Sequence, residues 1–192
     1  MQLGSSAEQS LNNAPGAPRG EGKLRDNIWK PILEEGGFDP LAQTNLPPVG
    51  WEPEFIEPFQ LADQIMELIE VDDFDKPWGF KAIKGLLFWK TLHKAFPGAQ
   101  WVFVERHREP HIASLMATPF MTAYDHAAGW GYYLDQIDKH IDDAWETVDV
   151  NAFWPINAKD GNWTHVAEFL HRLGLKMNEK VYQQVNYNLY RS

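Results

Sequence analysis

Apolar positions along the chain follow the spacing of helices in some stretches and of strands in others, and the two alternate most densely in its middle. Residues 78–82 form a short apolar run that predicts a strand, whereas residues 85–96 carry apolar side chains three or four positions apart, as a helix does. Residues 100–105 form a second apolar run, rich in β-branched and aromatic residues, that also predicts a strand. After a polar turn, Pro110 suits the first turn of a helix over residues 111–117. Strand–helix–strand–helix units of this kind build parallel sheets.

The same periodicity predicts four further helices, at residues 24–35, 59–70, 125–145 and 178–190. Pro31 predicts a kink or a break in the first of them, because proline has no N–H to donate. His140 falls on the polar face of the third and is expected to be solvated. Residues 39–58 are rich in proline and predict an extended excursion, and residues 146–150 predict one more short strand.

A length of 192 residues suits one domain, and 44% hydrophobic residues with nine tryptophans indicate a folded core. Residues 1–22 are rich in Gly, Ser, Asn, Ala and Pro, and they predict a flexible or irregular lead to a single domain of residues 23–192. The net charge of −10 argues against nonspecific nucleic-acid binding, which needs a basic face. The sequence has no cysteine, no long apolar run and no signal-peptide pattern, so we expect no disulfide, no membrane partner and a cytoplasmic location.

Residues 96–106, with the sequence FPGAQWVFVER, are followed by Ser114 and resemble the core of the sulfotransferase family. In bacterial and phage members of that family a strand ends in an arginine, and a serine eight positions later lies on the next helix. Both bind the 3′-phosphate of the donor, 3′-phosphoadenosine 5′-phosphosulfate. Arg106 and Ser114 keep this spacing, although Arg108 stands where the family usually has proline.

The resemblance implies an α/β fold of the three-layer P-loop type, in which helices flank a short parallel sheet. Residues 13–41 resemble the part of the family that follows the phosphate loop, so the first strand and the loop are expected to be missing. A missing strand would leave a sheet edge unpaired, which predicts a homo-oligomer or a cover formed by residues 1–22.

The resemblance also implies a nucleotide site. Its expected cofactor-binding residues are Arg106, Ser114, Lys81 and Lys84. The two lysines are the basic ends of a family segment whose Asp-Pro centre is absent here. The second substrate would be a hydroxyl acceptor of unknown identity. Glu105, His107 and His111 lie near in sequence, and nothing ranks them as the catalytic base.

Other readings stay open. Residues 16–23, GAPRGEGK, superficially look like a phosphate loop, but the spacing is one residue too long and no apolar strand precedes them. Without a cradle for the phosphosulfate, we expect no transfer activity from this chain. The alternatives are a noncatalytic scaffold or interaction protein, such as a phage-related one, and a P-loop phosphotransferase with a degenerate loop. No metal site is expected, because Pro110 separates His107 from His111 and no third ligand is evident.

Overall fold

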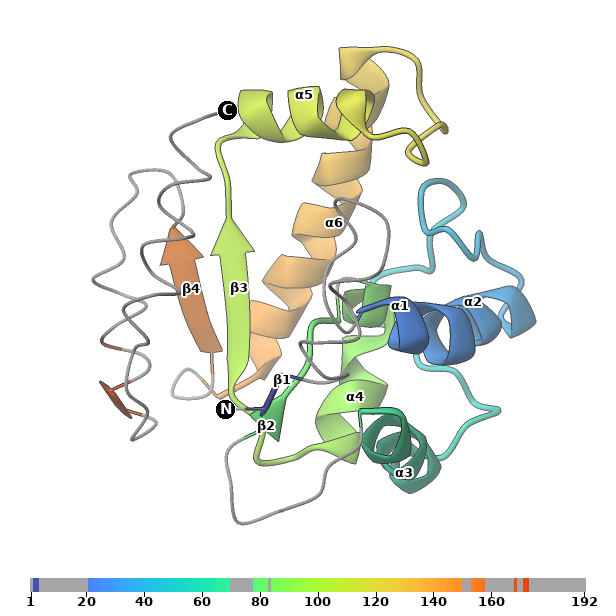
Figure 1. The fold of residues 1–192 in the computed structure, drawn as a ribbon, viewed down its shortest axis with the longest axis vertical. Coiled ribbons are helices and arrows are strands. Elements are labelled where there is room, and N and C mark those ends of the chain that lie inside the picture. The colour runs from blue at the N-terminus through green and yellow to red at the C-terminus, as the bar shows by residue number, and fades with distance from the viewer. Residues whose placement is uncertain are drawn as a thin grey trace.

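The computed structural model describes residues 2–3, 21–69, 78–82, 84–149, 153–157, 168 and 171–172 (Figure 1). Its elements in chain order are β1 (Gln2–Leu3), α1 (Glu21–Leu24), the π-helix η2 (Arg25–Trp29), α2 (Lys30–Glu35), α3 (Pro58–Leu68), β2 (Trp78–Gly79), the 3₁₀-helix η3 (Lys84–Phe88), α4 (Trp89–Ala95), β3 (Trp101–Glu105), α5 (Arg108–Ala117), α6 (Ala127–Thr147) and β4 (Phe153–Asn157). The helix predicted at residues 178–190 and most of the predicted lead lie outside these residues.

The predicted three-layer α/β fold of the P-loop type is wrong. Helices dominate the described part of the chain, and its strands form two separate parallel pairs, β1 with β2 and β3 with β4, instead of one sheet between two helical layers. The prediction that residues 78–82 and 100–105 share a sheet therefore fails. A two-residue strand near the start, β1, pairs with β2, and the expected absence of the family's first strand stays a prediction.

The apolar run at residues 78–82 fails as a full strand because its side chains serve the aromatic core. Only Trp78 and Gly79 pair with β1. The ring of Phe80 packs beside those of Trp29, at 6.3 Å, and Phe96, at 5.7 Å between centroids. Two paired residues are too few to form a layer of sheet, and the run packs against the helices instead.

The helix predicted at residues 24–35 is confirmed as the continuous run α1–η2–α2. Pro31 widens it rather than breaking it: the Lys30 N–H donates to the Arg25 carbonyl, five residues back. A π turn directly before a proline is one way in which a helix accommodates a residue without an N–H. The apolar stripe of this run is buried and comprises Leu24, Ile28, Trp29, Ile32 and Leu33.

The main core lies where this run meets α3, η3 and α4. It contains Leu24, Trp29, Leu61, Ile65, Phe88 and Leu92. The helix predicted at residues 59–70 is confirmed as α3, and that at residues 85–96 as η3 and α4. Trp51, in the extended excursion, packs its ring against Phe88 and Phe38, so it holds the excursion to the core.

A second, smaller core lies between β3 and the long helix α6. Leu86, Trp89, Ala144 and Val148 are buried there, and Trp101 and Phe103 of β3 pack against them. The helix predicted at residues 125–145 is confirmed, but the strand predicted at residues 146–150 is wrong at its start, because α6 continues to Thr147. The strand comes later, as β4, and its end meets the end of β3. Figure 1 shows α5 crossing the first part of α6.

Candidate functional sites

The polar turn after β3 is the first candidate site. Arg106 follows the strand directly, and α5 begins two residues later, so the predicted strand–turn–helix is present. Ser114 is exposed on α5. The carboxyl ends of the parallel strands β3 and β4 meet beside this turn, with Glu105 opposite Asn157. Ligands commonly bind at such ends.

The two arginines of the turn have different surroundings. Arg108 holds α5 to α6: its Nη2 donates to the Gly131 carbonyl at 2.6 Å and to Asp135 Oδ1 at 2.5 Å, and its Nη1 lies 3.6 Å from Asp138 Oδ2. Arg106 is exposed and makes no hydrogen bond or ion pair within the described residues. Arg108 is therefore a structural clamp between the two helices, whereas Arg106 stays exposed.

His111 connects Arg106 with the face of α5 that carries Ser114. Burial lowers the pKa of His111, the nearby positive charge of Arg106 lowers it further, and the negative charge of Asp138 raises it less. Arg106 thus lies close to His111, and Ser114 follows on the same helix three positions later, on a neighbouring face. That Arg106 and Ser114 bind one anion stays a prediction.

The two lysines follow β2. Nζ of Lys84 donates to the backbone carbonyls of Pro40, at 3.1 Å, and Leu41, at 2.7 Å, so it fastens the loop after α2. Lys81 is exposed. His107 lies at the start of α5 and is exposed, whereas His111 is half-buried. The assignment of the lysines to a nucleotide stays a prediction.

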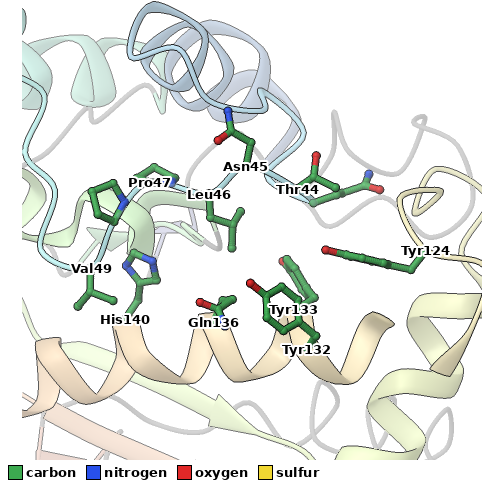
Figure 2. A pocket seen from close by; sticks show the side chains of 12 residues that line it. Thr44, Asn45, Leu46, Pro47, Val49, Tyr124, Tyr132, Tyr133, Gln136 and His140 are labelled. Carbon is green, nitrogen blue, oxygen red and sulfur yellow. The ribbon is translucent and has the colours of Figure 1, made fainter. Parts of the chain in front are cut away.

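A pocket between α6 and the loop before α3 is the second candidate site, and the sequence analysis missed it. Its volume is about 300 Å³. Figure 2 shows Tyr133, Gln136 and His140 rising from α6 toward the loop. The lining residues are Gln43, Thr44, Asn45, Leu46, Pro47, Pro48, Val49, Tyr124, Tyr132, Tyr133, Gln136 and His140.

Two buried or half-buried polar side chains shape the loop wall of this pocket. Asp39 accepts backbone N–H bonds from Leu41, Gln43 and Thr44 at 2.8–2.9 Å. Burial raises the pKa of Asp39, but these donors outweigh it, so the pKa lies below its usual value. Aspartate favours turns because its side chain accepts backbone N–H bonds, so Asp39 is the sequence signal that could have indicated this turn.

Gln43, only 4% exposed, ties this loop to the segment that carries Tyr124. Its amide nitrogen donates to the Phe120 carbonyl at 2.7 Å, and its Oε1 accepts from the N–H groups of Thr122 and Ala123 at 2.9 and 3.1 Å. All three partners lie almost 80 positions away in sequence. The pocket wall is therefore a product of the tertiary structure.

His140 is buried in the pocket wall, 2% exposed, so the expectation that it is solvated is wrong. Burial lowers its pKa; a hydrogen bond to the Pro47 carbonyl and the charge of Asp143 act in the opposite direction and do not outweigh burial. Burial raises the pKa of Tyr133 to about 12, with the charges of Asp39 and Tyr124 adding to the effect. Both side chains are neutral near pH 7.

Protonation of His140 should make stability depend on pH. The folded-state pKa lies below the ordinary value of 6.5, so the unfolded chain binds more protons as the pH falls through that value. The free energy of unfolding should therefore be highest above pH 6.5 and fall below it, until the folded state also takes up the proton. His111 contributes in the same direction. In urea titrations at several pH values, His140→Gln should flatten this fall; an unchanged slope would contradict the assignment.

Gly129 leaves room for the aromatic ring that closes one end of the pocket. A Cβ at Gly129 would lie 2.4 Å from Cδ1 and 2.6 Å from Cγ of Tyr124. Gly129→Ala must displace Tyr124 and should lower the free energy of unfolding by about 1–3 kcal/mol. Gly131→Ala is the matched control, because its Cβ would meet nothing closer than 3.6 Å and alanine favours the helix. Equal stability of the two variants in urea denaturation would refute this packing argument.

No family model matches the sequence, and no curated protein or solved structure matches the chain. Among the described helices, none combines the length and the apolar character that crossing a membrane requires. The described part also holds no cluster of three His, Asp or Glu residues placed to bind a metal ion. A function must therefore be argued from the two sites themselves.

Proposed function

We propose that the turn from Arg106 to Ser114 binds the 3′-phosphate of an adenosine nucleotide of the 3′-phosphoadenosine 5′-phosphosulfate type. The observation that carries the proposal is the position of Arg106. It stands exposed at the carboxyl end of a parallel strand, at the start of a helix, and without an ion pair in the part of the chain that the structure describes. The resemblance of residues 96–106 and Ser114 to sulfotransferases supplies the ligand.

The electrostatics of the turn support an anion there. Arginine offers a planar fork of donors that matches a phosphate, and the N-terminus of α5 adds the positive end of its dipole. Asp135 and Asp138 of α6 would repel an anion, but both face the guanidinium of Arg108. Arg108 therefore offsets the acidic face of α6 and leaves Arg106 uncompensated in an otherwise acidic chain.

The proposal covers nucleotide binding and no transfer of the sulfuryl group. Transfer needs a cradle for the phosphosulfate, a cation near the transferred group and a base for the acceptor hydroxyl. The segment at residues 16–23 departs from the spacing of a phosphate loop. Loss of one preorganised oxyanion donor alone lowers rates about 10²–10³-fold in other enzymes. We therefore expect no measurable turnover.

Calorimetry with adenosine 3′,5′-bisphosphate, beside adenosine 5′-monophosphate, tests the proposal. The bisphosphate should bind, and the monophosphate should bind at least about tenfold more weakly, because it lacks the 3′-phosphate. A transfer assay with labelled donor and a panel of hydroxyl acceptors should show only background. Equal affinity for the two nucleotides would show that Arg106 does not bind a 3′-phosphate. Measurable turnover would refute the expectation that the chain transfers no sulfuryl group. No binding of either nucleotide would support the alternative of a noncatalytic scaffold. A preference for ATP would support the alternative of a phosphotransferase.

A further inference from the structure

Helix α6 separates the pocket from the proposed nucleotide site. Gly131, Asp135 and Asp138 share one face of this helix and meet Arg108 of α5. The pocket residues Tyr133, Gln136 and His140 also recur three and four positions apart, but on the other side of the helix. The pocket is therefore independent of the proposed nucleotide site.

Among the described residues, those that line the pocket include no charged side chain. Its twelve residues are amides, hydroxyls, apolar side chains, tyrosines and one histidine. The lowered pKa of His140 and the raised pKa of Tyr133 keep the two titratable groups neutral. The negative charge of Asp39 is felt at Tyr133, which further disfavours an anion. Burying an unpaired charge here is unfavourable, so the pocket selects against ionised ligands.

His140, in the wall of the pocket, carries one ring nitrogen whose hydrogen-bonding capacity is unused. The Pro47 carbonyl beside the ring favours a proton on the nitrogen that faces it, and in the neutral ring the other nitrogen is an acceptor. Nδ1 is buried and has no hydrogen-bond partner in the described part of the chain, so we take it as that acceptor. Buried polar atoms are nearly always paired, and an unpaired one destabilises the folded state. A ligand that donates to Nδ1 would relieve this.

We propose that this pocket binds a small uncharged molecule that donates a hydrogen bond to Nδ1 of His140. A volume of about 300 Å³ admits only a small ligand. Tyr124, Tyr132 and Tyr133 offer ring faces to a flat molecule, and Gln136 offers an amide that both donates and accepts. These features fit a ring compound with hydroxyl or amide groups, of the size of a monosaccharide or an aromatic amide.

Nuclear magnetic resonance with two pairs of probes tests the proposal. Glucose and nicotinamide are uncharged and carry donors; glucuronate and nicotinate are their anionic counterparts. At least one uncharged probe should shift the ¹⁵N resonance of His140 Nδ1 together with the ring signals of Tyr133, in a saturable way. Its anionic counterpart should bind at least about tenfold more weakly. The absence of any saturable shift with both uncharged probes, or equal binding of the charged ones, overturns the proposal.

Variants locate the binding on α6. His140→Phe should abolish the response, whereas His126→Gln, at the exposed start of α6, should leave the affinity unchanged. If His140→Phe does not fold, Gln136→Ala provides the same test, because Gln136 is half-buried and lines the pocket; its affinity should fall by about tenfold. Unchanged affinity in Gln136→Ala and in whichever His140 variant folds would place the probes elsewhere. Arg106→Ala should not alter this binding.

Discussion

Replacing Arg106 with alanine should lower the affinity for adenosine 3′,5′-bisphosphate by about 10- to 100-fold, which is the loss of one charged hydrogen-bonding partner. Stability should hardly change, because Arg106 is exposed and makes no hydrogen bond or ion pair within the described ranges. Calorimetry measures the affinity, and thermal unfolding without ligand measures the stability. A fall in affinity with an unchanged melting temperature is the expected pair of results.

Two other substitutions separate this effect from simpler ones. Lys139→Ala removes one positive charge from an exposed position on α6 and should leave the affinity within about twofold, since screening weakens distant charges. Arg108→Ala should instead lower the free energy of unfolding by about 1 kcal/mol, because it releases a partly exposed clamp between α5 and α6. Equal losses of affinity in Arg106→Ala and Lys139→Ala would show that the nucleotide responds to overall charge and not to a specific contact with Arg106.

Gln43→Ala should lower the free energy of unfolding by about 3 kcal/mol, because one buried amide satisfies three backbone groups that would be left unpaired. The loop before α3 and the segment before α6 would lose their link, so the melting temperature should fall clearly. Urea denaturation checks the value. Gln60→Ala, at an exposed position of α3, is the matched control and should stay within about 0.5 kcal/mol of the parent.

An effect of Gln43→Ala no larger than that of Gln60→Ala would contradict the structure of the pocket wall. The variant also bears on the pocket itself, since Gln43 lines it and positions the segment that carries Tyr124. A destabilised but folded Gln43→Ala protein should show altered Tyr124 ring signals. That result would connect the hydrogen bonds of Gln43 with the shape of the pocket.

The helices could be predicted from the sequence because their signal is local. An apolar stripe at a spacing of three and four positions is written into residues 24–35, 59–70 and 125–145, and each is a helix in the structure. At Pro31 the structure has a widened turn within a continuous helical run, in place of the predicted kink or break.

The sheet could not be predicted in the same way, because the partner of a strand is not contained in its own sequence. Residues 78–82 and 100–105 both look like strands, but β2 pairs with β1 and β3 pairs with β4. The adjacency of these runs in sequence suggested one sheet, and Phe80 shows why it fails: its ring contributes more as part of the aromatic core.

The two candidate sites also differ in whether their residues lie close together in sequence. The Arg106 turn is local, so a strand, a polar turn and a helix could be placed from the sequence, whereas the clamp of Arg108 on α6 could not. The pocket depends on a loop and a helix that are far apart along the chain, and His140 was assigned to solvent because its own helix gives it a polar neighbourhood. The loop that carries Pro47, far away in sequence, contributes to its burial.

The most direct measurement is a crystal structure of the chain soaked with adenosine 3′,5′-bisphosphate. The account predicts the 3′-phosphate between the guanidinium of Arg106 and the hydroxyl of Ser114, with oxygens at about 2.7–2.9 Å from the nitrogen donors. Side chains of Arg106 and Ser114 that point away from each other, or a nucleotide bound elsewhere, would contradict it.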